Sequence, residues 1–205
     1  MKPIAIGGSA ANPPHLVHAL LISKLLECNR FSKVIWIISG DRKDKQYNVT
    51  PDDRVTMTEL TIGQLRGRFN TELIIKYNDV YYENTPTITY IENIKKEFPQ
   101  SEVIWYTGSD SIIPKYDGKC EIEAKWHRGE ELMKTTSFLV FPRKRFKLPD
   151  TLPSNIEIFN IELPNISSSD IRKKIKKRQV FEHLVTPLVA IYIIIHKLYG
   201  YGEKL

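Results

Sequence analysis

The sequence has few of the features that cross-link a small protein or carry it across a membrane. Its 205 residues include only two cysteines, Cys28 and Cys120. Two are too few for a disulfide framework or a cysteine-rich zinc site, so we expect free thiols and a reducing compartment. The most apolar run, 188–195, is far shorter than the ~20 residues that span a bilayer, and it predicts a core helix. The first residues lack the apolar core of a secretory signal, so we expect a cytoplasmic protein with no membrane partner.

Two widespread nucleotide-binding signatures are also missing. The sequence contains neither a G-x-x-x-x-G-K-[ST] phosphate loop nor a G-x-G-x-x-G after a strand, which argues against the kinases and dehydrogenases that carry them. It has no internal repeat, and 41% apolar residues are ordinary for a globular domain. The net charge of +6 suits a polyanionic partner, but nucleic acid, a membrane surface and a nucleotide would each satisfy it.

Short runs rich in β-branched residues alternate with helical patterns along the chain. The expected strands are 2–6, 34–39, 72–77, 102–107, 137–141 and 156–161. The expected helices are 15–28, one that starts at Thr50, 87–97, 129–134 and one capped by Ser167. This alternation predicts an α/β fold: a Rossmann-like, doubly wound parallel sheet with flanking helices. We expect one domain over 1–205, with 166–205 as a small C-terminal helical part that completes the ligand site.

The most informative segment follows the first expected strand and reads GGSAANPPHLVH (7–18). Small residues let a phosphate approach the backbone, and the start of the next helix offers free N–H groups and the positive end of its dipole. His15 and His18 would lie one turn apart on the same face, where both can donate to a phosphate chain. The alternative is a plain strand–loop–helix connection with one partly buried histidine. A zinc site lacks a third ligand at a diagnostic spacing.

A second segment, ISSSDIRKKIKKR (166–178), combines a helix start with basic residues. Ser167 is placed to cap the helix, while Ile166 and Ile171 occupy the positions of a hydrophobic staple. Serine hydroxyls, free amides and the Arg172 guanidinium would form an oxyanion cradle. The alternative is a surface helix with cations near its C-terminal end, and it suits most of the lysines. A nucleic-acid patch would lack an accompanying stacking platform or helix-turn-helix.

Two further segments hold candidate ligand contacts. IWYTGSDSI (104–112) ends a strand and places Asp110 at the carboxyl edge of the sheet, where an acid can accept hydrogen bonds from ribose or adenine. A turn or helix-cap aspartate explains it about equally well. In KWHRGEEL, Trp126 lies beside His127 and could stack on a flat cationic ring, although packing is the commoner role of such a tryptophan.

Taken in order, these segments resemble the nicotinate/nicotinamide mononucleotide adenylyltransferases of the nucleotidylyltransferase superfamily, almost from end to end. ISSSDIR is similar to that family's ISST-x-IR, and 8–18 is similar to its G-[GT]-[ST]-[FA]-[DN]-P-x-[HT]-x-G-H, with Val17 in place of the glycine between the histidines. Further matches are DRKDK (41–45), where the family has a basic loop, TPDDRVTMTEL (50–60), TPTITYIENIKKEFP (85–99), WYTGSDSI (105–112), WHRGEELMKTTSFLVFPR (126–143) and HLVTPLVAIYIIIHKLYG (183–200).

The resemblance implies transfer of AMP from ATP to nicotinate or nicotinamide mononucleotide, with Mg²⁺ carried by the phosphates and no protein metal ligands. It assigns catalysis to His15, His18 and Arg172. The ATP-binding residues would be Gly8, Ser9, Asn12, Gly108, Asp110, Ser167 and Ser168. The pyridine-nucleotide contacts would be Thr87, Trp126 and His127. We expect no nucleic-acid partner, and a homo-oligomer stays open. Two alternatives also stay open: transfer to another phosphate acceptor, and a non-catalytic RNA- or nucleotide-binding protein.

Overall fold

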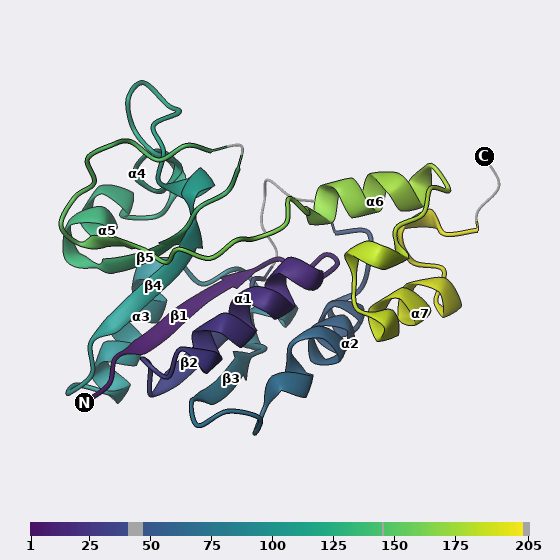
Figure 1. Ribbon diagram of the computed structural model, residues 1–205, viewed down its shortest axis with the longest axis horizontal. Helices are drawn as coiled ribbons and strands as arrows, with labels where there is room; N and C mark the ends of the chain where they lie inside the picture. The colour runs from purple at the N-terminus through teal and green to yellow at the C-terminus, as the bar shows by residue number, and fades with distance from the viewer. Residues whose placement is uncertain (41–46, 145, 203–205) are drawn as a thin grey trace.

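The computed structural model describes residues 1–40, 47–144 and 146–202. The segment DRKDK (41–45), which matched a basic loop in the resemblance, lies outside the described residues. The rest of the chain forms a single sheet covered by helices, with a group of helices beyond one end of it (Figure 1).

A six-stranded, wholly parallel sheet forms the centre of the protein, in the order β3-β2-β1-β4-β5-β6. The strands are β1 (Ile4–Ser9), β2 (Lys33–Ile38), β3 (Glu72–Lys76), β4 (Val103–Gly108), β5 (Ser137–Phe141) and β6 (Ile156–Ile158). Their apolar, β-branched sequences suit strands that are buried on both faces. All six expected strands are present, and the α/β prediction is confirmed.

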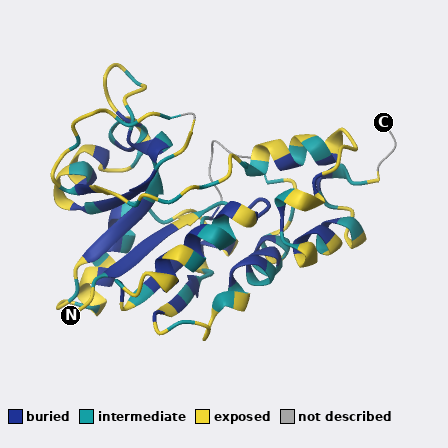
Figure 2. Ribbon diagram, in the orientation of Figure 1, coloured by how far each residue is buried: buried dark blue, intermediate teal, exposed yellow. Residues whose placement is uncertain are grey.

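Helices cover both faces of this sheet, which makes it doubly wound. One face packs against α1 (Leu16–Glu27) and α2 (Pro51–Thr61) in a cluster that includes Leu25 and Trp36. The other packs against α3 (Thr87–Glu97), α4 (Glu121–Lys125) and α5 (Gly129–Thr135) in a cluster that includes Ile91 and Trp105. Buried residues follow these two layers, and exposed ones lie on the outer faces of the helices (Figure 2). The sequence reasoning missed α4.

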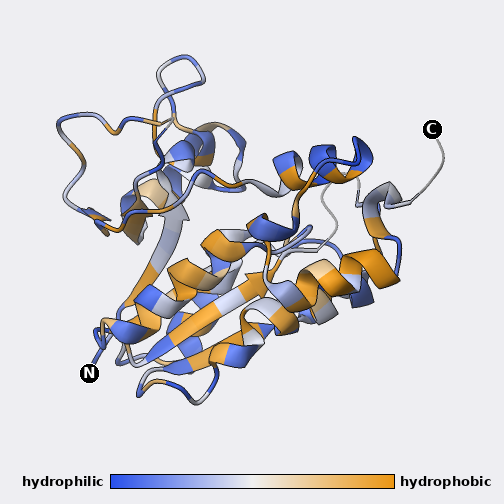
Figure 3. Cartoon of the chain, turned by 45° about the vertical axis from the view of Figure 1, so that its right-hand side comes forward, coloured by the Kyte–Doolittle hydropathy of each residue, from blue (hydrophilic) through white to orange (hydrophobic). Residues whose placement is uncertain are grey.

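The C-terminal helices α6 (Ser168–Lys176) and α7 (Pro187–Ile195) build a third, smaller core of their own. It joins the main body through α2, which contributes the fully buried Met57. The prediction that 188–195 is a core helix is only half right. Ile193 is buried, but Leu188, Ile191 and Ile195 are exposed, because this short helix is apolar all round while only one side meets α2 (Figure 3).

No helix in the described ranges is both long and apolar enough to cross a bilayer. Neither cysteine forms a disulfide, as expected.

The strand order also determines where a ligand can bind. β1 lies between β2 and β4, and the chain passes from β3 at one edge back to β4 beside β1 through α3. Connections therefore leave β1 and β4 toward opposite faces, which opens a crevice at the carboxyl ends of these strands.

Candidate active site

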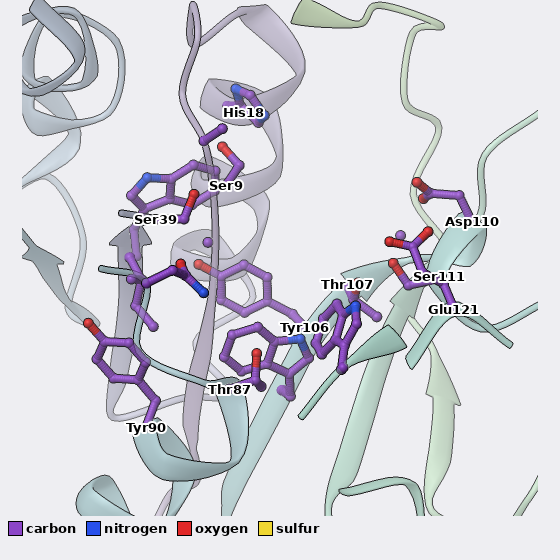
Figure 4. Close-up of a pocket in the computed structure, with 18 of the residues that line it drawn as sticks. Ser9, His18, Ser39, Thr87, Tyr90, Tyr106, Thr107, Asp110, Ser111 and Glu121 are labelled. Carbon is purple, nitrogen blue, oxygen red and sulfur yellow. The ribbon is translucent and has the colours of Figure 1, made fainter. Parts of the chain in front are cut away.

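A cavity of about 1460 Å³ occupies this crevice. It exceeds the ~300–1,000 Å³ typical of a site for one small molecule, so it has room for two. Ser9 and His18 lie at one end, Asp110, Ser111 and Glu121 at a second, and Thr87 at a third, on the side of Tyr90 (Figure 4). Eight of the predicted site residues line it: Gly8, Ser9, His18, Thr87, Gly108, Asp110, Trp126 and His127.

Gly8 contributes to the site in a way that differs from the expectation. It lies inside β1, opposite Ile37 of β2, rather than in a loop after the strand. A Cβ atom at this position would clash with the carbonyl oxygen of Ile37. The glycine is therefore required for the close approach of two strands, and the turn toward α1 begins only at Ser9, whose Oγ accepts from the Ala11 N–H at 3.1 Å.

The two predicted histidines stack on each other at the start of α1. Their ring centroids are 3.8 Å apart and their planes differ by 15°. His15 is the N-cap residue and is only 4% exposed, while His18, one turn on, lines the cavity and contacts the edge of Trp36. The predicted common face of the two rings is therefore present.

The histidine pair is held neutral, with a defined tautomer at His18. Burial, with a smaller effect of the Arg143 charge, lowers the pKa of His15 to about 4. Burial, together with His15 and Arg143, lowers the pKa of His18 well below its ordinary value. The His15 backbone N–H donates to Nδ1 of His18 at 3.2 Å. A neutral ring that accepts at Nδ1 carries its hydrogen on Nε2, so His18 offers an N–H donor at neutral pH.

The low pKa of His15 makes stability depend on pH. The unfolded chain binds a proton near pH 6.5 and the folded chain only near pH 4, so the folded state loses stability as the pH falls through this window. Between pH 7 and pH 5 we expect His15 to account for about 2 kcal/mol of that loss. Denaturant unfolding of wild type and His15→Asn at both pH values measures it. Equal losses in the two proteins would contradict the assignment.

The start of α6 docks onto the loop that leads into α1. Ser167 caps the helix as predicted, and its Oγ accepts from the Asp170 N–H at 3.1 Å. Ser168 Oγ donates to the carbonyl of Pro13 at 2.9 Å, and Nη1 of Arg172 donates to the carbonyl of Asn12 at 2.6 Å. Two predicted segments that lie 160 residues apart are thus joined by direct hydrogen bonds.

These hydrogen bonds place the remaining predicted residues beside the cavity. Asn12 and His15 are buried in the loop itself. Arg172 borders a second hollow of about 340 Å³, together with Ser169, Lys173 and Lys176. The predicted phosphate ligands are therefore divided between two hollows. Ser9 and His18 line the large cavity, and Arg172 borders the small one.

The far end of the cavity is organised by an ion pair. Nε of Arg143, which follows β5, lies 3.1 Å from Oδ1 of Asp110. The backbone N–H of Arg143 donates to Ser109 Oγ at 2.9 Å. A side chain at Gly108 would clash with the Asp110 carboxylate and come close to the Arg143 guanidinium. Gly108 and Asp110 are thus parts of one arrangement, in which the glycine makes room for the pair.

The wall between these ends is apolar. Trp126 ends α4 and meets Trp105 edge to face, with ring centroids 6.0 Å apart and planes at 86°. Both tryptophans line the cavity, so Trp126 has the predicted packing role and also offers a flat surface to a ligand. His127 is exposed at the rim. Thr87 begins α3, whose cap residue Pro86 makes no side-chain cap to the first amides.

Two arginines that the sequence reasoning did not select hold this site together. Arg54 of α2 is 1% exposed, donates from Nε to the carbonyl of Ala10 at 2.8 Å, and also donates to the carbonyl of Ser39. It ties the turn after β1 to the end of β2. The positive charge of Arg143 contributes to the lowered pKa values of His15 and His18. Both arginines fall within segments that carried the resemblance, which was the available signal.

The protein offers no ready-made metal cage in the part of the chain that the structure describes. No three side chains of histidine, cysteine, aspartate or glutamate come together there in a way that could hold a metal ion. Asp110, an acid that follows β4, is already paired with Arg143.

A doubly wound parallel sheet with a cavity for two ligands and a histidine pair at its first helix is the architecture of an α/β nucleotidyltransferase. A family model of the cytidylyltransferase-like proteins matches residues 6–174. The chain therefore belongs to the cytidylyltransferase-like family.

Curated relatives and solved structures of similar size match the whole chain. A probable nicotinate-nucleotide adenylyltransferase of Oceanobacillus iheyensis is 25% identical over 205 residues and covers 100% of both chains. One of Geobacillus thermodenitrificans is 28% identical over 207 residues, covering 98% of this chain and 87% of its own. The structure of Plasmodium falciparum nicotinic acid mononucleotide adenylyltransferase complexed with NaAD superposes with a TM-score of 0.84 at 24% identity, covering 100% of both chains. That likeness supports the fold.

Proposed function

We propose that the protein transfers the adenylyl group of ATP to the 5′-phosphate of nicotinate mononucleotide, releasing pyrophosphate, and that it accepts nicotinamide mononucleotide less well. The observation that carries the proposal is the junction of the stacked histidines with the docked start of α6 at one end of a cavity that has room for two nucleotides. The names of the curated relatives support the same reaction.

The chemistry needs alignment and charge stabilisation rather than a general base. An oxygen of the acceptor phosphate, already ionised at neutral pH, forms a bond to the α-phosphorus of ATP. The bond from that phosphorus to the bridging oxygen of the leaving pyrophosphate breaks, and the leaving group takes the electron pair. Negative charge grows on the phosphate oxygens during the step, so fixed donors aimed at them supply the catalysis.

The donors fit this task by their placement. His18 contributes its Nε2–H, and α1 adds the positive end of its dipole and its free amides. Arg172 reaches the phosphates from the flank, where 166–205 completes the ATP site. Asn12 Oδ1 and His15 Nδ1 are buried without a hydrogen-bond partner among the described residues, which is typical of a site that a ligand completes.

Magnesium would reach the site on the triphosphate. With no cluster of acids among the described residues, the phosphate oxygens and water would hold it. Bound there, Mg²⁺ would neutralise charge on the leaving pyrophosphate.

For the acceptor, the start of α3 and the tryptophan wall provide the contacts. The uncapped first amides of α3 and the Thr87 hydroxyl suit a carboxylate on the pyridine ring, and Trp126 suits its flat face. We propose that Gly108 and Asp110 contact the adenosine.

Pyrophosphate release with MgATP and nicotinate mononucleotide tests the proposal, and an acceptor screen tests its alternative. Release with a different phosphate acceptor alone would move the protein to another reaction on the same fold. A salt-sensitive RNA shift without turnover would favour the binding protein instead.

We expect kcat/KM to favour nicotinate over nicotinamide mononucleotide by ~10-fold or more, because an amide NH₂ would meet donors that already face it. Trp126→Ala should weaken both acceptors and leave ATP binding intact. Steady-state kinetics with each acceptor, plus an ATP titration, measures both effects. Equal rates with the two acceptors would overturn the preference without touching the ATP site.

A further inference from the structure

A buried carboxylate outside the reaction chemistry organises one wall of the cavity. Asp79 lies in the short helix η2 (Asn78–Tyr81) after β3 and is only 4% exposed. It accepts three hydrogen bonds: from the Thr85 N–H at 2.7 Å, from Thr85 Oγ1 at 2.8 Å and from the Tyr90 hydroxyl at 2.7 Å. A buried charge is tolerated when it is satisfied in this way.

The direction of these hydrogen bonds follows from chemistry. An ionised carboxylate has no hydrogen to give, so both hydroxyl groups must donate theirs to Asp79. Burial and the Asp79 carboxylate raise the pKa of Tyr90 above its ordinary value, so this hydroxyl keeps its proton. Each hydroxyl has a single hydrogen. The two hydroxyls also interact with each other. With both hydrogens given to Asp79, their remaining lone pairs can only accept.

The residues that carry these hydroxyls border the cavity. Thr85 and Tyr90 both line it, at the part formed by the start of α3, and Figure 4 places Tyr90 on the side away from Asp110. The segment that carries Thr85 is also firmly seated. A Cβ at Gly40 would clash with the carbonyl oxygens of Asp79 and Tyr82, so the residues just after β2 pack tightly against the segment that leads to Thr85.

We propose that Asp79 is a positioning residue that turns Thr85 and Tyr90 into hydrogen-bond acceptors, so that the acceptor nucleotide must present a hydrogen-bond donor to this wall. The inference rests on the proposed function. The donor has two chemical sources, a ribose hydroxyl or the carboxamide NH₂ of the nicotinamide form. A ring carboxylate has no such hydrogen, and it is directed instead to the amides at the start of α3.

Asp79→Asn reverses this polarity with almost no change in size. The Thr85 N–H bonds to one carboxylate oxygen of Asp79, and both hydroxyls bond to the other. The carbonyl of an asparagine would therefore face the Thr85 N–H, and its NH₂ group would donate to the hydroxyls, whose own hydrogens then turn toward the cavity. A donor on the ligand would meet a donor, a mismatch of the kind that costs ~10-fold or more in a water-poor site. We expect the KM and the Kd of the acceptor to rise by this factor, with the KM of ATP within twofold of wild type.

The two sources of the donor predict different patterns. If a ribose hydroxyl donates, the Kd values of nicotinate and nicotinamide mononucleotide rise together in Asp79→Asn. If the carboxamide donates, only the value for nicotinamide mononucleotide rises. Either pattern supports the positioning role.

A second variant and a matched control keep the test decisive. Tyr90→Phe removes one acceptor without touching Asp79 and should raise the Kd of the same mononucleotide. Asp150→Asn, at an exposed aspartate, should change nothing. A purely structural role of Asp79 would lower the melting temperature and move the ATP and acceptor constants together. Acceptor Kd values within twofold of wild type in both folded variants would overturn the inference.

Direct binding separates this inference from the proposed function. Calorimetric titration with each mononucleotide needs no turnover. If wild type binds neither, the proposed function fails and the inference falls with it. If wild type binds and turns over while both variants match it, only the positioning role of Asp79 fails.

Discussion

His18→Ala is expected to lower the kcat of adenylyl transfer by ~10²-fold or more while the Kd of ATP changes much less. Removing one fixed donor that faces charge developing in the transition state typically costs this much. The structure gives the reason in detail: the ring is neutral, its Nδ1 is occupied by the His15 N–H, and its remaining hydrogen is on Nε2. Single-turnover kinetics with saturating MgATP, combined with an equilibrium titration of ATP, separates the two quantities.

The same substitution also removes an acceptor at the start of α1, so folding has to be checked. Thermal unfolding shows whether the loss of the His15–His18 hydrogen bond weakens the helix as a whole. His183→Ala, at an exposed histidine of the C-terminal part, is the matched control and should behave as wild type. A kcat for His18→Ala within a few-fold of wild type would remove the histidine from the chemistry.

Arg172→Ala should weaken ATP binding and turnover together, by about 10- to 100-fold. A charge-assisted hydrogen bond contributes about 1.5–3 kcal/mol, and each 1.4 kcal/mol corresponds to a factor of ten. The variant also loses the contact with the Asn12 carbonyl that holds α6 against the loop. The Kd from ATP titration should rise, and the kcat from pyrophosphate release should fall, by similar factors.

Lys176→Ala and Lys177→Ala are the controls for Arg172→Ala, because they test whether the loss of any positive charge near α6 has the same effect. They remove the same charge from the end of the same helix but, among the described residues, make no hydrogen bond or ion pair with the loop before α1, so they should be nearly silent. Equal effects of all three substitutions on the Kd of ATP would indicate a diffuse basic surface, and the RNA-binding interpretation would gain.

The strands and most helices could be predicted from the sequence because their signals are local. β5, α3 and the cap of α6 by Ser167 lie where the pattern placed them. α4 was missed because it has five residues and its cap residue is Cys120, which is not one of the residues that usually mark a helix start. Residues 188–195 were expected to form a core helix, but several of them are exposed, because hydropathy cannot indicate how many neighbours a helix has.

The site residues differ in the same way: some could be recognised from local sequence, and others could not. His15, His18 and the start of α6 belong to short motifs whose chemistry is visible in a few neighbouring residues. Arg54, Asp79 and Arg143 act through partners that the fold alone brings near, such as Ala10, 44 residues from Arg54, or Asp110 beside Arg143. Gly8 resembled a phosphate contact in the sequence, and only the register with Ile37 reveals the steric demand between strands.

Because α6 is docked on the loop before α1, ligand binding and local unfolding both depend on the equilibrium between the docked and undocked states of α6 and α7. The helices α6 and α7 have their own small core, and Ser168 and Arg172 hold them to that loop. A polyphosphate that binds at this junction stabilises the docked arrangement by RT ln(1 + [L]/Kd) and leaves the undocked one unaided. Amide hydrogen exchange in α6 and α7 should therefore slow with nucleotide concentration along the same curve that describes binding, while the β-sheet amides keep their rates.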